Sequence, residues 1–168
     1  YQGVLHGFQS FIPHMVEHGE ESHLMTTVSL AGLLTGSGTY GVSKHAVMAL
    51  TEAARNDLLT RGANVSVSAL CPGFVDTNID KSERNRPGYL THQDVSLDES
   101  GISPVSQLLR RGKQPSEIAD IVFEAIKKGI FYILPHPAWD EMLRDRFDQM
   151  LSREPIPTPS PDEMARFF

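Results

Sequence analysis

Tyr40-Gly41-Val42-Ser43-Lys44 places a phenol and an ammonium group four residues apart, at the start of a segment whose apolar residues recur with a helical period. Residues at i and i+4 lie on one face of a helix, so the two polar groups can reach the same small volume. A free tyrosine titrates near pH ~10, and a nearby cation favours its phenolate form. The pair is therefore a candidate general acid and base, although a tyrosine and a lysine on a solvated helix surface would show the same spacing.

Two strand-like segments flank this pair. Upstream, residues 27–32 (TVSLAG) bring Ser29 to the end of a strand and continue into a glycine-bearing loop. Downstream, residues 65–70 (VSVSAL) alternate as a strand does and run into CPGFVDT at 71–77. This order of a strand ending in serine, a Tyr-x-x-x-Lys helix and a strand followed by Pro-Gly-x-x-x-Thr resembles the short-chain dehydrogenase/reductase family. The resemblance extends from residue 1 to about residue 137.

The resemblance assigns roles to three side chains. Tyr40 is implied to donate a proton to a carbonyl oxygen during reduction and to remove one from an alcohol during oxidation. Lys44 is implied to hold the ribose of a nicotinamide cofactor and to favour the phenolate of Tyr40. Ser29 is implied to hydrogen-bond the substrate oxygen, and a strand-end hydroxyl that caps a loop is the alternative interpretation of this serine.

The hydroxyl position has a second candidate. Fewer residues separate Ser29 from Tyr40 than the family usually has, whereas Thr27 has the usual separation and points to the same face of the strand as Ser29. The Ala31-Gly32 sequence that follows favours Ser29. The sequence therefore predicts Ser29 with a shortened loop after it, and leaves Thr27 open.

The loop after the second strand is implied to border the cofactor. Its Pro-Gly pair lets the backbone turn tightly beside the nicotinamide, and Thr77 is implied to contact the carboxamide. The cofactor-binding residues that the resemblance implies are Tyr40, Lys44, Pro72, Gly73, Val75 and Thr77. The resemblance implies a nicotinamide cofactor, NAD or NADP. The sequence does not distinguish the two, because the residues that do so lie in a part of the fold without a counterpart here.

The other elements follow from the periodicity of the apolar residues. The predicted helices span 1–18, 39–61, a segment opening at Pro115 and 139–151, and the predicted strands span 24–29, 65–70 and 130–134. The strand at 130–134 is a continuous apolar run, which indicates cover on both faces. Four prolines between 155 and 161 predict an extended tail. The alternation of strands and helices predicts an α/β fold with a parallel sheet between helices.

The cofactor-binding opening of the family has no counterpart in this sequence. Family members begin with a Gly-rich turn that seats the cofactor pyrophosphate at a helix N-terminus, and no G-x-x-x-G-x-G pattern occurs here. The resemblance therefore implies the C-terminal half of a doubly wound, Rossmann-type parallel sheet. Residues 1–137 are predicted to form this partial domain, without its dinucleotide-binding half, and residues 138–168 a C-terminal helix and proline-rich tail. Residues 78–113 are predicted to form a lid or binding segment.

Composition argues against several functional classes. A formal charge of −6 and a pI near 5.6 disfavour nucleic acid or an anionic membrane surface as the main partner. The single cysteine makes no internal disulfide, and no apolar run approaches the ~18 residues of a membrane span. The first residues lack the basic start of a signal peptide, and the seven histidines lack metal-ligand spacing. These features predict a cytoplasmic protein without a metal site.

The sequence thus predicts an oxidoreductase that interconverts a small-molecule alcohol and a carbonyl compound through Ser29, Tyr40 and Lys44. The alternative is a catalytically inactive fragment or a dimerisation module of such an enzyme. The helices at 1–18 and 39–61 match the pair that family members pack against a symmetry-related subunit, which predicts a homo-oligomer.

Overall fold

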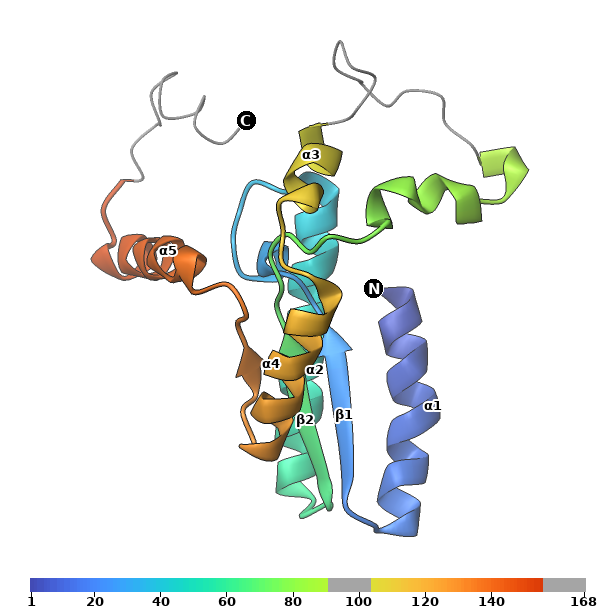
Figure 1. Ribbon diagram of the computed structural model, residues 1–168. Coiled ribbons are helices and arrows are strands. Elements are labelled where there is room, and N and C mark those ends of the chain that lie inside the picture. The colour runs from blue at the N-terminus through green and yellow to red at the C-terminus, as the bar shows by residue number, and fades with distance from the viewer. Residues whose placement is uncertain (91–103, 156–168) are drawn as a thin grey trace. The chain divides into compact units, whose positions relative to one another are not determined.

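The computed structural model describes residues 1–90 and 104–155. Its sheet has three parallel strands in the order β1-β2-β3, as the alternation of strands and helices predicted (Figure 1). The strands are β1 (Ser22–Thr27), β2 (Val65–Leu70) and β3 (Tyr132–Ile133). The α-helices in the described ranges are α1 (Gln2–His18), α2 (Gly38–Thr60), α3 (Pro104–Arg110), α4 (Pro115–Lys127) and α5 (Asp140–Ser152).

The chain divides into two compact units. The first comprises Tyr1–Gly73 and Ser116–Arg146, and so contains the sheet, α1, α2, most of α4 and the start of α5. The second comprises Phe74–Pro115 and the chain from Phe147 onward. It contains α3 and two short 3-10 helices, η2 (Ile79–Asn85) and η3 (Gly88–Leu90).

The faces of the sheet follow from the alternation in β2. Val65 and Val67 share a face and form a buried cluster with Leu58 of α2, against which Ile12 and Met15 of α1 pack. On the opposite face Ser68 is fully buried, and its hydroxyl donates to the Ile130 carbonyl at 2.8 Å. In Figure 1, α2 and α4 lie on opposite sides of the sheet, so helices cover both faces as predicted.

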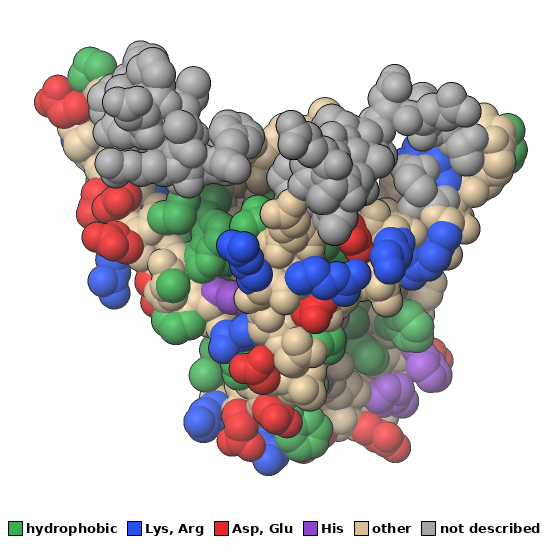
Figure 2. Space-filling view, turned by 45° about the horizontal axis from the view of Figure 1, so that its top comes forward, with side chains coloured by type: hydrophobic (Ala, Val, Ile, Leu, Met, Phe, Trp, Pro, Cys, Tyr) green, Lys and Arg blue, Asp and Glu red, His purple; other side chains and the backbone are tan. Residues whose placement is uncertain are grey.

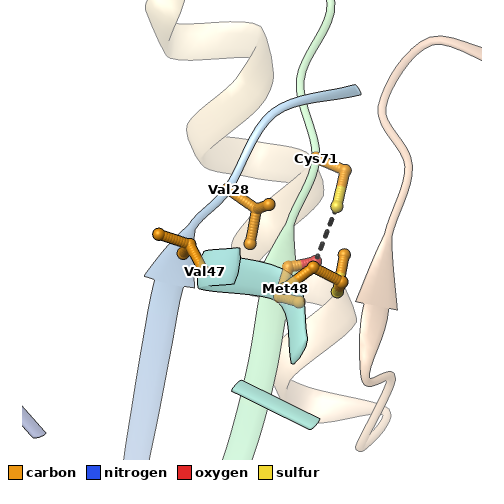
Figure 3. Close-up of a cluster of buried hydrophobic side chains, with 5 residues drawn as sticks. Val28, Val47, Met48 and Cys71 are labelled. Carbon is orange, nitrogen blue, oxygen red and sulfur yellow. Dashed lines mark hydrogen bonds between the residues drawn. The ribbon is translucent and has the colours of Figure 1, made fainter. Parts of the chain in front are cut away.

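A small apolar cluster lies where β1 and β2 end. Val28 follows β1, Cys71 follows β2, and both pack with Val47 and Met48 of α2 and with Ala69 (Figure 3). Burial raises the pKa of the Cys71 thiol to about 11. The thiol therefore remains neutral at physiological pH and acts as a small core residue.

The helix ends agree with the glycine positions in the sequence. Gly19 follows α1 with φ 70°, and Gly62 lies two residues beyond the end of α2 with φ 64°. Both dihedrals lie in the left-handed region, which a residue with a Cβ adopts at a cost and which commonly ends a helix. The predicted helices at 1–18 and 39–61 are thus confirmed to within one residue.

Two strands differ from their predictions. The strand predicted at 24–29 begins at Ser22 and ends at Thr27, because the backbone turns sharply at Ser29. The strand predicted at 130–134 has only two paired residues, and Tyr132 is 49% exposed. The prediction of a strand covered on both faces is therefore wrong for Tyr132.

The segment 78–113, which shows no sustained period in the sequence, contains η2, η3 and α3. Residues 91–103 of this segment lie outside the described residues, as does the proline tail beyond Pro155. None of the helices in the described ranges combines the length and the hydropathy needed to cross a bilayer. Both acidic and basic side chains lie on the face that Figure 2 shows.

Candidate active site

Ser29 lies where the chain leaves β1 and enters the short 3-10 helix η1 (Leu30–Gly32). Its backbone has φ 145° and ψ 157°, a conformation that residues with a Cβ rarely adopt. The Oγ accepts a hydrogen bond from the Ala31 N–H at 3.1 Å, so the side chain caps η1 and its hydroxyl hydrogen can still donate. Backbone strain of this kind, about 1–3 kcal/mol, concentrates at functional sites.

Tyr40 and Lys44 lie on one face at the start of α2. The Lys44 Nζ is 5.7 Å from the centroid of the Tyr40 ring, within the range of a cation–π contact. Tyr40 is 49% exposed, so its ring is accessible from solvent. The Lys44 Nζ also donates to the Thr27 carbonyl at 3.3 Å. This hydrogen bond ties the helix that carries Tyr40 to the end of β1, two residues before Ser29.

Gly32 fixes how closely η1 approaches α2. A Cβ at Gly32 would lie 2.6 Å from the Val28 Cγ1 and 2.8 Å from the Lys44 carbonyl oxygen. Both separations are below any normal contact, so only glycine allows this approach. The glycine therefore holds the turn after Ser29 directly against the backbone of the Tyr40-Lys44 helix.

The Pro72-Gly73 pair follows β2 and contacts the same turn. The Pro72 carbonyl accepts a hydrogen bond from the Leu30 N–H at 2.9 Å, which connects the loop after β2 to the residue following Ser29. The Gly73 N–H donates to the Nδ1 of His136 at 3.1 Å. This hydrogen bond holds the His136 ring against the Pro-Gly loop.

Val75 and Thr77 belong to the second unit, whereas the Tyr40-Lys44 pair belongs to the first. Val75 forms a parallel bridge with Lys113, and the Asp76 N–H donates to the Lys113 carbonyl at 2.9 Å. A Cβ at Gly112 would lie 2.5 Å from the Phe74 carbonyl oxygen, so this approach also requires glycine. These contacts hold the segment before Thr77 against the chain that follows α3.

An ion pair braces the same segment. The Arg110 guanidinium of α3 donates to the Asp76 carboxylate at 2.8 Å, and the Gln114 amide donates to it at 3.4 Å. A hydrogen bond from Ser106 and the nearby charge of Arg110 lower the pKa of Asp80. Periodicity alone could not indicate this network, because the two partners of each contact lie more than twenty residues apart in the sequence.

Three parts of the predicted site lie in one unit, and the fourth, Val75 with Thr77, lies in the other. The strained Ser29, the Tyr40-Lys44 face and the Pro72-Gly73 loop lie in the first unit and are joined by hydrogen bonds through Thr27 and Leu30. Within the described residues no three His, Cys, Asp or Glu side chains gather in a metal-binding arrangement. The chemistry that these residues support is proton transfer and hydrogen bonding by a phenol, a hydroxyl and a nearby ammonium.

Known proteins share both the sequence and the fold. A sequence profile of the short chain dehydrogenase family matches residues 1–88. The crystal structure of a short chain dehydrogenase/reductase from Burkholderia phymatum in complex with NAD is 40% identical, with a TM-score of 0.79. That match covers 94% of this chain and 58% of the other.

Two curated relatives match over nearly the whole chain. A 1-deoxy-11-beta-hydroxypentalenate dehydrogenase from Streptomyces exfoliatus is 32% identical over 157 residues, which are 92% of this chain and 50% of the relative. A CLA biosynthesis dehydrogenase/reductase from Lactiplantibacillus plantarum is 28% identical over 155 residues, 88% of this chain and 54% of the relative. The chain spans about half the length of these relatives. Because the family profile matches 88 of its 168 residues, the chain belongs to the short chain dehydrogenase family.

Proposed function

We propose that this chain carries the catalytic site of an oxidoreductase that interconverts an alcohol and a carbonyl compound. The observation that carries the proposal is the Tyr40-Lys44 pair, with the Lys44 Nζ 5.7 Å from the Tyr40 ring and hydrogen-bonded to the strand end that leads into Ser29. A phenol and a cation on one accessible helix face, beside a strained serine, suit proton exchange with a substrate oxygen.

Tyr40, Lys44 and Ser29 have different roles in the proposed reaction. In the reductive direction the Tyr40 hydroxyl donates its proton to the carbonyl oxygen, and in the oxidative direction the phenolate removes the alcohol proton. The Lys44 ammonium favours that phenolate through space. The Ser29 hydroxyl donates to the substrate oxygen, which orients it and stabilises the negative charge that develops there. Thr27 remains the alternative hydroxyl, and its carbonyl accepts from Lys44.

A nicotinamide cofactor, NAD or NADP, fits the residues present. The Lys44 ammonium and the Tyr40 hydroxyl share a half-exposed face suited to ribose hydroxyls, and the relative from Burkholderia phymatum binds NAD. When bound, the cofactor supplies or accepts the hydride. Tyr40 and Lys44 would hold its ribose, and Pro72 and Gly73 would border its nicotinamide. The cofactor contacts of Val75 and Thr77, which the family resemblance implies, remain a prediction. The predicted cytoplasmic location and homo-oligomeric state remain predictions.

The test is activity of the full-length protein that the gene encodes, assayed with both cofactors against a panel of alcohols and ketones. Tyr40→Phe keeps the ring and removes the proton, so kcat should fall by about 10²–10⁴. Cofactor affinity should fall much less, because Lys44 still holds the ribose. The matched control is Tyr132→Phe, which removes a tyrosine hydroxyl on β3 that donates to Glu52. Retention of most activity in Tyr40→Phe would remove this residue from the mechanism. Absence of turnover with wild-type protein would favour the alternative of an inactive dimerisation module.

A further inference from the structure

The start of α5 packs against the turn that follows Ser29. Leu143 of α5 forms a buried cluster with Leu30 and Leu34, and Trp139 and Met142 pack against it. Arg146 lies one turn further along α5, within the first unit. Its Nη1 donates to the Leu33 carbonyl and also contacts the Nε2 of His45 at 3.0 Å. One guanidinium therefore reaches both the loop after η1 and helix α2.

The His45 ring continues this connection to the first turn of α2. Its Nδ1 lies 2.9 Å from the Gly41 carbonyl. A carbonyl oxygen only accepts, so the Nδ1 carries the hydrogen, and the neutral ring presents a lone pair on Nε2 to the Arg146 N–H. The donors and acceptors are thus consistent from Arg146 through His45 to Gly41, the residue after Tyr40.

The loop between Leu34 and α2 lies at the surface of the first unit. Every residue from Thr35 to Tyr40 is exposed, and Gly36 and Gly38 have φ values of 94° and 52°. Glycine with positive φ has the greatest backbone freedom to lose on folding. The Arg146 Nη1 carries two N–H groups, and it contacts one acceptor on each side of this loop, the Leu33 carbonyl and the His45 Nε2.

We propose that Arg146 is a positioning residue for the site, which holds the turn after Ser29 and the first turn of α2 in a fixed relation. It acts through two contacts, the Leu33 carbonyl on the side of Ser29 and the His45 ring on the side of Tyr40 and Lys44. The proposal rests on the proposed function, because it assumes that these three side chains act together. Misplacement of reacting groups by about 1 Å can lower a rate about 10²-fold, so a distant clamp of this kind affects catalysis.

The first test is independent of activity. In the full-length protein, Arg146→Met should increase amide hydrogen exchange across residues 33–41 by about tenfold or more, because hydrogen bonds from a charged donor are lost. The matched control is Arg144→Met, which removes an exposed arginine from the same helix. Exchange in this segment that is equal in the two variants would overturn the proposal.

The second test separates positioning from general packing. Arg146→Met should lower kcat by about ten- to a hundredfold with KM changed less than about threefold, whereas Arg144→Met should match wild type. His45→Gln retains one donor and one acceptor and should keep most of kcat, whereas His45→Leu retains neither and should behave as Arg146→Met does. Equal losses in the two His45 variants would contradict a link through this ring.

Two further outcomes are distinguishable. If Arg146→Met does not fold, Arg146→Lys keeps the charge on a side chain that is one bond shorter, and increased exchange at residues 33–41 in that variant would support the proposed contacts. If the wild-type protein turns over no alcohol or ketone, the proposed function fails. Exchange of residues 33–41 then still decides whether Arg146 clamps the loop, since that measurement requires no substrate.

Discussion

Ser29 combines an unfavourable backbone with a polar side chain. With φ 145° it would be more stable as glycine, yet the sequence keeps a hydroxyl there, hydrogen-bonded to the Ala31 N–H. We therefore expect Ser29→Gly to increase the free energy of unfolding by up to about 1–3 kcal/mol while lowering kcat. Ser29→Ala should lose kcat without that gain, because alanine keeps the strain.

Denaturant unfolding and steady-state kinetics on the same three proteins check this prediction. A Ser29→Gly variant that is both less stable and fully active would contradict it. In that case the hydrogen bond to Ala31 would outweigh the strain, and Thr27 would become the better candidate for the catalytic hydroxyl.

His23 gives the first unit a pH-dependent stability. Its Nε2 lies 3.0 Å from the Ser68 hydroxyl, and burial lowers the pKa of His23 below its ordinary value of 6.5. The unfolded chain therefore binds a proton more readily than the folded one. The stabilisation is complete above about pH 6.5 and is lost as the pH falls through that value toward the lowered pKa.

The measurement is urea unfolding of the full-length protein at several values between about pH 5 and pH 8. His23→Gln keeps an N–H donor for Ser68 and cannot titrate, so its stability should fall less on acidification than that of wild type. His6→Gln, an exposed position on α1, is the matched control. Identical pH dependence in wild type and His23→Gln would refute this role for His23.

At the scale of elements, the close packing of η1 against α2 depends on Gly32. A Cβ there would overlap the Lys44 carbonyl, so Gly32→Ala must push η1 away from the helix or displace the helix itself. We expect a loss of stability of about 1–3 kcal/mol, typical of overpacking, together with a lower kcat.

The matched control for this substitution is Gly7→Ala. Gly7 lies inside α1 with no atom within 4 Å of a Cβ at that position, and alanine there should stabilise the helix by about 0.5–1 kcal/mol. Thermal unfolding of both variants separates two effects: the steric overlap of a Cβ at position 32, and the general effect of replacing a glycine by alanine. A Gly32→Ala variant as stable and active as wild type would contradict this prediction, because η1 and α2 would then accommodate a Cβ without cost.

The sequence predicted those helices and strands that carry a periodic pattern of apolar residues within their own length. The helices α1, α2 and α4 carry amphipathic stripes, and β2 alternates, so periodicity located all four. β3 was predicted too long, because five apolar residues indicate burial but not how many of them pair. The residues 78–113 gave no pattern for α3, a seven-residue helix too short to show a period.

For the site, the spacing of Tyr40 and Lys44 sufficed, because residues four apart in a helix must share a face. The contacts of Arg146 could not be predicted in this way. They depend on how α5 packs against the turn after Ser29, a tertiary arrangement that leaves no local trace in the sequence.

At the scale of the whole molecule, the outer edge of β1 determines how residues 1–168 should behave by themselves. Within residues 1–90 and 104–155, β1 pairs with β2 alone, so its other edge presents a row of backbone N–H and C=O groups beside Met25, which is 38% exposed. Such an edge is a template for pairing with another strand, in a second copy of the chain or elsewhere. The chain also spans only about half the length of its relatives and contains no Gly-rich pyrophosphate-binding turn.

We therefore expect residues 1–168, expressed alone, to self-associate or aggregate and to bind neither NAD nor NADP. Sedimentation over a range of concentrations and calorimetric titration with each cofactor test the two statements separately. Met25→Lys places a charge at the edge and should reduce self-association, whereas Met150→Lys, an exposed methionine on α5, is the matched control. A soluble monomer that binds either cofactor at micromolar concentration would contradict the prediction, because Lys44 and the Pro72-Gly73 loop would then suffice for cofactor binding without a pyrophosphate site.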